Sequence, residues 1–273
     1  MTRTVLITGA AGNIGGKLAA HFKQTRAYEL RLLDQHAGGD ILAADFGIYD
    51  EGWAKHFAGV DTVIHLAGDP RGKASWASVQ RANIMGTQHV LRASREAKVR
   101  RVVFASTNQV MLGYRFREEV TKVTTDLPPL PLSPYGVSKL FGEDMGHGFA
   151  AETGISFIAL RIGYFQRGEN RPGPHMKIGL WGQSMWLSNR DMNHAIERSI
   201  EAEDVPFAIL NLESDNPGMR WDIEHTRQII GYRPQEGHPP VMLPENLHED
   251  EKARATRMPP GTWFDEMFEV VEP

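Results

Sequence analysis

The 273-residue chain contains no cysteine, which excludes disulfide bonds and thiol catalysis and suits a reducing compartment. It has no apolar run approaching the roughly 18 residues of a membrane-spanning helix. Acidic residues outnumber basic ones, 34 to 30, so no basic excess points to nucleic acid or an acidic membrane. Its 11 histidines show no HExxH or comparable spacing, and no metal site is predicted. Because the first predicted strand begins a few residues after Met1, no signal peptide is expected, and the expected location is the cytoplasm.

What the chain does contain is a regular alternation of apolar strands and helices, with 41% hydrophobic residues for a large core. Strands are predicted at Thr4–Thr8, Glu29–Leu33, Ile41–Ala44, Thr62–Leu66, Arg101–Ser106, Ser156–Arg161 and Pro206–Leu212. Helices are predicted at Asn13–Gln24, Trp53–Ala58, Ser75–Ala97, Tyr135–Glu152, Met185–Glu201 and Trp221–Ile230. This order predicts one α/β domain over residues 1–273, a Rossmann-type doubly wound parallel sheet with a small C-terminal substrate-binding region.

A glycine-rich turn joins the first predicted strand to the first helix. Gly9, Gly12 and Gly15 follow the strand in the spacing GxxGxxG, where the unpaired amides of a helix N-terminus favour an anion. Gly9 suits a tight turn, Gly12 a close approach of phosphate, and Gly15 close packing of the helix on the strand. The motif predicts a dinucleotide site, although the spacing departs from the usual GxGxxG.

The residue that ends the next strand indicates which nucleotide binds. Asp34 lies about 20 residues past the glycines, where a carboxylate suits the ribose diol of NAD and repels the phosphate of NADP. Gln35 and His36 follow it, with no arginine or lysine directly after. The predicted cofactor is therefore NAD.

Polar or small residues follow the other predicted strands, at the edge where ligands bind in such sheets. Asp45, followed by Phe46, could accept a hydrogen bond from the adenine amino group, and Leu66, Ala67 and Gly68 would let backbone lie against the cofactor ribose. Further such residues are Ser106, Thr107, Asn108, Gln109, Ile162 and Gly163. His65, at the end of the fourth strand, is expected to be structural.

Tyr135 and Lys139 are spaced by one helical turn, so both side chains can face one site. A free tyrosine has a pKa near ~10, too high for a good base at neutral pH, and a nearby ammonium, together with the positive nicotinamide ring, would lower it. Thr107 could hold the substrate hydroxyl against the phenolate. The sequence therefore predicts an acid/base pair beside the nicotinamide.

Two stretches interrupt the alternation. Thr125–Pro134 is proline-rich and leads into the Tyr135 helix, which Ser133 or Ser138 could cap. Gly163–Trp186 is long and without clear secondary structure, which is typical of a functional loop. Substrate-binding elements are therefore expected within 163–190 and 211–273.

These motifs resemble, in order, those of the extended short-chain dehydrogenase/reductases, the NAD-dependent epimerase/dehydratase family. The matching motifs are TGAAGNIG at 8–15, Asp34, Asp45 with Phe46, HLAG at 65–68, FAST at 104–107 and YGVSK at 135–139. The resemblance implies Thr107, Tyr135 and Lys139 as the catalytic triad. It also implies that Asn13, Ile14, Asn83, Ser106 and Ile162 join the cofactor site.

Within that family the chain looks most like uronate dehydrogenases and related NAD-dependent aldose dehydrogenases. The segments that carry this resemblance are Phe104–Asn108, Tyr135–Asp144, Arg161–Gly163 and Trp186–Ser188. Uronate dehydrogenases carry an arginine for the substrate carboxylate where this chain has Trp181. Arg167 or Arg171 could substitute for it. Gln109 stands where that group has a histidine, and the segment holding Arg71, which borders the sugar pocket, also differs.

The expected reaction is NAD-dependent oxidation of a free sugar or sugar acid at the anomeric carbon to a lactone. The expected substrate-binding residues are Arg71, Thr107, Asn108, Gln109, Tyr135, Gly163, Arg171 and Trp181. Alternatives are a sugar epimerase or dehydratase that regenerates its NAD, a reductase of a small ketone or aldehyde, and a non-catalytic NAD-sensing protein. The family further implies a homodimer or higher homo-oligomer through the helices Ser75–Ala97 and Tyr135–Glu152.

Overall fold

Seven parallel strands form one sheet in the computed structural model, which describes residues 2–117 and 119–248. The strands are β1 (Thr4–Thr8), β2 (Glu29–Asp34), β3 (Ile41–Ala43), β4 (Thr62–His65), β5 (Arg101–Thr107), β6 (Ser156–Ile162) and β7 (Phe207–Leu212). Their order is β3-β2-β1-β4-β5-β6-β7, so the chain reverses direction across the sheet after β3. The carboxyl ends of β1 and β4 flank that switch point, where ligands bind in doubly wound sheets. The predicted fold is confirmed.

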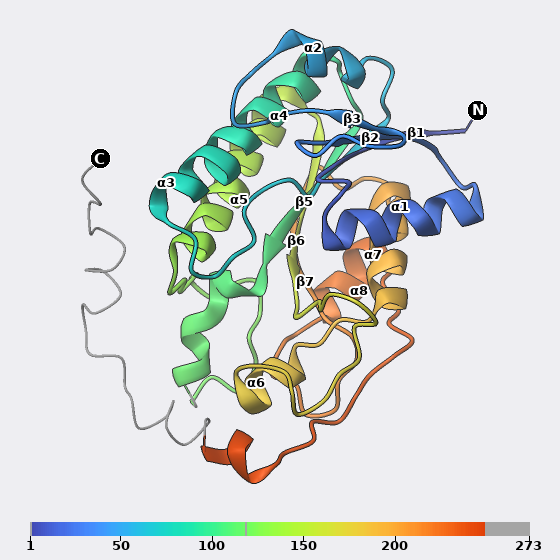
Figure 1. Cartoon of the computed structure of the whole chain (residues 1–273). Coiled ribbons are helices and arrows are strands. Elements are labelled where there is room, and N and C mark those ends of the chain that lie inside the picture. The colour runs from blue at the N-terminus through green and yellow to red at the C-terminus, as the bar shows by residue number, and fades with distance from the viewer. Residues whose placement is uncertain (1, 118, 249–273) are drawn as a thin grey trace.

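Helices cover both faces of the sheet. The helices are α1 (Asn13–Thr25), α2 (Glu51–Ala54), α3 (Trp76–Val79), α4 (Gly86–Glu96), α5 (Pro134–Thr153), α6 (Gly179–Ser184), α7 (Asn189–Glu201) and α8 (Glu224–Ile230). α1, α7 and α8 lie on one face, and α2, α4 and α5 on the other (Figure 1). No helix in the described part of the chain is long and apolar enough to cross a membrane.

The predicted helix Ser75–Ala97 is one rod of three parts. A π-helical stretch, Gln80–Met85, joins α3 to α4. Such a stretch widens the helix locally and is frequent at functional sites. The sequence pattern did not reveal it, and it contains Asn83.

The predicted helix Met185–Glu201 starts too early. α7 begins at Asn189, because Ser188 is extended and its hydroxyl accepts a hydrogen bond from Asp191 N at 3.0 Å, which makes it the N-cap. Residues 185–187 instead run beside the end of β6, where Tyr164 and Trp186 form a β-bridge. The preceding loop is not wholly irregular either, since it contains the short helix α6.

Other predicted boundaries differ in smaller ways. The helix predicted from Trp221 begins at Glu224, because Trp221 forms a β-bridge with Val123. The helix predicted at Trp53–Ala58 is α2 followed by a 3-10 turn at Lys55–Phe57. A nine-residue 3-10 segment at Asn108–Phe116, directly after β5, was not predicted.

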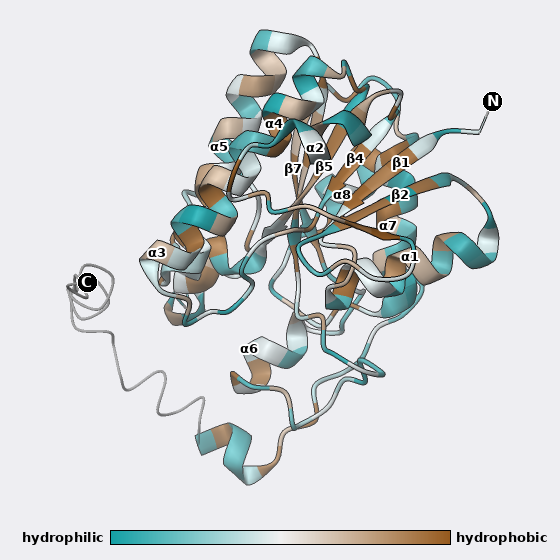
Figure 2. Cartoon of the chain, turned by 45° about the horizontal axis from the view of Figure 1, so that its top comes forward, coloured by the Kyte–Doolittle hydropathy of each residue, from teal (hydrophilic) through white to brown (hydrophobic). Residues whose placement is uncertain are grey.

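Three large apolar clusters, and a small one formed by Ala74, Val79 and Tyr135, organise the interior of the described residues. Two lie on opposite faces of the sheet, whose strands are mostly hydrophobic along their length (Figure 2). The third lies at the carboxyl edge of β5–β7 and is formed by Val110, Met111, Tyr114, Val123, Trp181, Met185 and Trp221. This third cluster packs the segment after β5 against α6, in the region expected to bind substrate. Residues 249–273, which were also expected to contribute to substrate binding, lie outside the described residues.

Candidate active site

The glycine-rich turn has the geometry that its sequence predicts. Gly9 has φ +73°, and a Cβ there would lie 2.7 Å from Ala67 N, so both the turn and the neighbouring β4 loop require glycine. A Cβ on Gly15 would lie 2.2 Å from Gly9 O, which confirms its role in close packing. Gly12 is the N-cap of α1 and brings no side-chain cap.

The first turn of α1 is open to an anion. It has no side-chain hydrogen bond at its cap and no acidic residue, so its outward amides and the helix dipole favour a phosphate group. Asn13 and Lys17 donate to Gln166 O at 3.2 and 3.0 Å, which draws the loop after β6 across this helix end. Ile14 is half-buried between them.

Asp34 is tied to the same turn. It is buried, and its two carboxylate oxygens accept hydrogen bonds from Ala11 N at 3.0 Å and His36 N at 2.9 Å. These bonds hold the carboxylate beside the glycine loop at the end of β2, where a ribose diol would be bound. An uncapped helix terminus with an acid beside it fits a dinucleotide.

The segment after β3 differs from its predicted role. Asp45 forms an ion pair with Arg81 that holds the pKa of its carboxyl below the usual value, and about half of its side chain is exposed. Phe46 is buried against Trp53, with ring centroids 5.0 Å apart, so its side chain belongs to the core. The backbone of Phe46, rather than its side chain, could therefore contact the cofactor.

Asn83 connects the loop after β4 to α5. The buried Asn83 amide accepts from Asp69 N at 2.6 Å and donates to Asp69 O at 3.2 Å and to Ser138 Oγ at 2.8 Å. Gly68 has φ +151°, and a Cβ there would lie 2.8 Å from Asn83 Oδ1 and 3.7 Å from Lys139 Nζ. Gly68 therefore lies against the predicted catalytic lysine, while Leu66 and Ala67 lie against Gly9 of the glycine-rich turn.

His65 has the structural role expected for it. The ring is fully buried and hydrogen-bonds Thr8 Oγ1 at 2.8 Å and Thr87 Oγ1 at 3.1 Å. Burial lowers the pKa of His65 to about 3, and Lys139 contributes by repulsion. The ring is therefore neutral at physiological pH.

α5 carries the predicted tyrosine and lysine at its first turns. Ser133, rather than Ser138, is the N-cap, accepting from Gly136 N at 3.1 Å, with Pro134 at the first helical position. Tyr135 then faces the end of β5 and is hydrogen-bonded to Thr107. The buried Lys139 ammonium, one turn on, lies 4.8 Å from the centroid of the Phe104 ring.

The titration of this group differs from the prediction. Burial raises the pKa of Tyr135 to about 12, the hydrogen bond from Thr107 offsets part of the rise, and Asp69 adds to it. Burial also lowers the pKa of Lys139 to about 8. The protein alone therefore does not supply the expected lowering of the tyrosine pKa, because desolvation outweighs its neighbours.

Below the triad, Glu143 and Arg161 form a buried ion pair between α5 and β6. Arg161 donates from Nε at 2.9 Å and from Nη2 at 2.8 Å, and Ser106 Oγ donates to the same carboxylate at 2.5 Å. The hydroxyl of Ser106, predicted to touch the cofactor, is thus used within the protein. Sequence reasoning missed this pair as a brace for α5.

Some predicted substrate residues gather beside the triad. Asn108 donates to the sulfur of Met185, and Gly163 is needed because a Cβ there would lie 2.3 Å from Met185 O. Gln109 accepts from Ser133 Oγ at 3.3 Å, next to the α5 cap. Trp181 is buried in the cluster that contains Met185.

The two predicted arginines are oriented elsewhere. Arg71 is mostly exposed and forms an ion pair with Asp69 at 2.6 Å, on the loop whose Gly72 lies beside Gln109. Arg171 is 80% exposed and forms an ion pair with Glu169 at 2.6 Å. Arg167 is also exposed.

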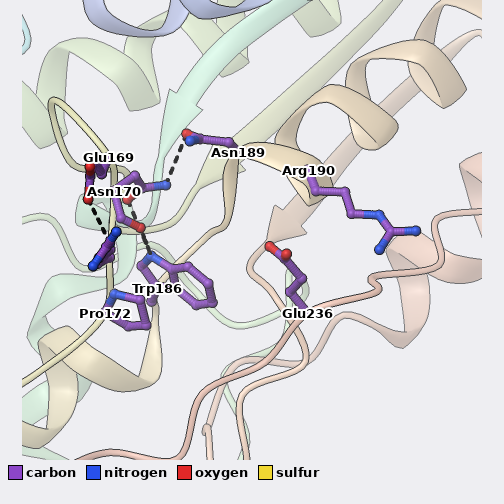
Figure 3. Close-up of a pocket in the computed structure, with 8 residues that line it drawn as sticks. Glu169, Asn170, Pro172, Trp186, Asn189, Arg190 and Glu236 are labelled. Carbon is purple, nitrogen blue, oxygen red and sulfur yellow. Dashed lines mark hydrogen bonds and ion pairs between the residues drawn. The ribbon is translucent and has the colours of Figure 1, made fainter.

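Arg171 lines a separate hollow of about 360 Å³ (Figure 3). The other lining residues are Glu169, Asn170, Pro172, Trp186, Asn189, Arg190 and Glu236. None of Thr107, Tyr135 and Lys139 is among them, so the structure does not bring Arg171 to the triad. Within residues 2–117 and 119–248, no group of three or more acidic or histidine side chains could hold a metal ion.

Comparison with known proteins agrees with this geometry. The chain is 35% identical to an NAD-dependent glucose-6-phosphate dehydrogenase of Haloferax volcanii over 86% of this chain and 94% of that protein. It is 32% identical to an L-arabinose 1-dehydrogenase (NAD(P)(+)) of the same organism over 87% and 98% of the two chains. A crystal structure of glucuronic acid dehydrogenase from Chromohalobacter salexigens is similar, with a TM-score of 0.74, 30% identity and coverage of 87% and 86%. The profile of the NAD dependent epimerase/dehydratase family matches residues 5–174. The chain belongs to that family.

Proposed function

We propose that the protein is an NAD-dependent dehydrogenase that oxidises a free sugar or sugar acid at the anomeric carbon to a lactone. The observation that carries the proposal is the meeting of Thr107, Tyr135 and Lys139 at the carboxyl edge of the sheet, beside the glycine-rich turn. The relatives named above act, by their names, on glucose 6-phosphate, L-arabinose and glucuronic acid. All three are sugars that carry no nucleotide.

NAD supplies the hydride acceptor when bound. We assign its pyrophosphate to the open first turn of α1 and its ribose diol to Asp34, whose carboxylate is already fixed beside that turn. Gly68 and Lys139 meet below the expected nicotinamide ribose, and Lys139 would hold the ribose hydroxyls. A buried carboxylate at the position of Asp34 would repel the additional phosphate of NADP.

Tyr135 is proposed to take the proton of the anomeric hydroxyl. Thr107 shares a hydrogen bond with Tyr135, so its hydroxyl is placed to orient the sugar against the phenol oxygen. Since burial raises the tyrosine pKa, deprotonation depends on positive charge, and Lys139 is the charged residue one turn away on α5. General-base assistance of this kind contributes about 10²- to 10⁴-fold to a rate.

Replacing Tyr135 by phenylalanine tests this assignment. The variant is expected to bind NAD normally but to lose about 10²- to 10⁴-fold in turnover, measured as NADH absorbance with a panel of aldoses and uronic acids. Tyr114→Phe is the matched control, because Tyr114 is equally buried and its hydroxyl donates only to Pro128 O, at 2.8 Å. Unchanged turnover in Tyr135→Phe would refute the mechanism. Interconversion of sugars without net NADH would instead identify an epimerase.

A homodimer through the helical stretches Ser75–Ala97 and Tyr135–Glu152 belongs to the same proposal. Trp76, Met85 and Phe141 leave large apolar side chains 39%, 41% and 47% exposed on the helices that form this side of the molecule. Exposed apolar residues grouped on one side are typical of an association surface. Sedimentation equilibrium would measure the state of association.

A further inference from the structure

A buried glutamate follows β7 at the same edge of the sheet. Glu213 has no exposed surface, and neither of its carboxyl oxygens has a hydrogen-bond partner among the described residues. Buried polar groups in folded proteins are nearly always bonded, so an orphaned carboxyl needs a reason. Nothing in the sequence distinguishes this residue from an ordinary glutamate at the end of a strand.

Strand register places Glu213 beside the substrate residues. Gly163 N donates to Leu212 O at 2.9 Å, and a Cβ on Gly163 would lie 3.1 Å from Glu213 Cγ. Thr107 pairs with Ile162, which pairs with Leu212, so two strand spacings, about 10 Å, separate Thr107 from the end of β7. A six-carbon sugar held at Thr107 can bridge that distance.

Side-chain alternation also places Glu213 on the face of the sheet that carries Tyr135. Arg161 pairs in register with Asn211 and reaches Glu143 on α5, so residues 161, 211 and 213 share the α5 face. Three further buried donors lack a hydrogen-bond partner within residues 2–117 and 119–248: Arg161 Nη1, Trp181 Nε1 and Trp221 Nε1. The two indole rings lie 5.3 Å apart.

The charge of this region favours a neutral ligand group. The guanidinium of Arg161 makes a bidentate contact with Glu143, so most of its charge is already matched by a carboxylate. Burial raises the pKa of Glu213 well above its usual value, although attraction to Arg161 opposes the rise, and this shift favours the protonated carboxyl, which can both donate and accept. Arg220 lies over the ring of Trp181, 5.1 Å from its centroid, and donates to Val120 O. A carboxylate or phosphate here would be buried without a counter-charge.

We propose that Glu213 is a substrate-binding residue that hydrogen-bonds a hydroxyl at the end of the sugar remote from the oxidised carbon, and that it selects neutral aldoses over uronates and sugar phosphates. This inference rests on the proposed sugar dehydrogenase function and narrows its substrate class. It assigns the unpaired carboxyl a partner that offers both a donor and an acceptor, as an alcohol does and an anion does not.

The test compares Glu213→Leu and Glu213→Gln with Glu236→Leu, a control glutamate on the separate hollow of Figure 3. For wild type, kcat/KM is expected to be at least about tenfold higher for an aldose than for its uronate, and about tenfold lower for its 4-deoxy or 6-deoxy analogue. Glu213→Leu should oxidise the aldose and that analogue equally well. Glu213→Gln should stay within about threefold of wild type, because an amide also donates and accepts.

A binding measurement separates this inference from the proposed function. In the Tyr135→Phe background with NAD present, calorimetry should show the dissociation constant of the aldose raised about tenfold by Glu213→Leu and unchanged by Glu236→Leu. Absence of NADH formation from every sugar would refute the dehydrogenase function, while calorimetry would still decide Glu213. The inference is overturned by any of three results. The first is an unchanged dissociation constant for the aldose in Glu213→Leu, and the second is an equal ratio of kcat/KM for aldose and deoxy analogue in wild type and variant. The third is a higher kcat/KM of the wild type for a uronate than for its aldose. Glu213→Ala serves if Glu213→Leu does not fold.

Discussion

Replacing Glu143 by glutamine is expected to lower the free energy of unfolding by about 3–5 kcal/mol, the range for breaking a buried ion pair. Arg161 makes two charge-assisted bonds to Glu143, at 2.9 and 2.8 Å, and each is worth about 1.5–3 kcal/mol. The side chains of Arg161 and Glu143 are 2% and 0% exposed, so water cannot replace the lost contact. Glutamine would also turn amide hydrogens toward the guanidinium, leaving a buried charge uncompensated.

Urea unfolding at constant pH measures this loss, and Asp215→Asn provides the matched control. Asp215 contacts Arg227 at 2.9 Å, almost the same distance, but its side chain is 59% exposed, so its neutralisation should cost at most about 1 kcal/mol. The double variant Glu143→Leu with Arg161→Met should be more stable than Glu143→Leu alone, because it removes the orphaned charge. The reasoning fails if Glu143→Gln is no less stable than Asp215→Asn.

Three other predictions follow from the structure. His65 has a pKa of about 3 in the folded chain, whereas the same side chain in the unfolded chain gains a proton below about pH 6.5. Its contribution to the free energy of unfolding is therefore fully present above pH 6.5 and is lost as the pH falls toward 3. Urea unfolding should show a loss from this group of about 2 kcal/mol between pH 7.5 and pH 5, and His65→Asn should remove that part of the acid sensitivity. Asp34→Ala should raise the KM for NAD about 10- to 100-fold with kcat at saturation retained, and an unchanged KM would exclude Asp34 from the ribose site. Phe141→Glu should yield monomers in sedimentation equilibrium. Leu42→Glu is the control, because Leu42 is 41% exposed but lies on the edge strand β3, and this variant should remain associated. Equal molecular masses of the two variants would argue against α5 as the interface.

The cofactor half of the site was predictable because its chemistry depends on local backbone geometry. Gly9 and Gly15 stand where a tight turn and a close helix contact leave no room for a Cβ, and Asp34 ends the neighbouring strand. Tyr135 and Lys139 lie one turn apart on a helix that Ser133 caps. Each of these relations spans only a few residues, or two adjacent strands.

The substrate half depends on contacts between distant segments. Trp181 meets Trp221, and Asn108 meets Met185, across 40 and 77 residues of sequence. Arg171, expected to bind substrate, lines a hollow whose other lining residues include none of Thr107, Tyr135 and Lys139, so its role toward a substrate stays a prediction.

The doubly wound sheet, the dinucleotide turn and the spacing of Tyr135 and Lys139 are legible in the amino-acid sequence, because apolar periodicity, glycine geometry and helix pitch are local properties. Which groups lose their contact with water depends on how distant segments pack in the folded chain. The tertiary structure paired Glu143 with Arg161, buried Glu213 with no hydrogen-bond partner for its carboxyl among residues 2–117 and 119–248, and raised the pKa of Tyr135 by desolvation. Burial is a property of the packed chain, and it shifts the pKa values of Tyr135, Lys139 and Glu213 at this edge of the sheet.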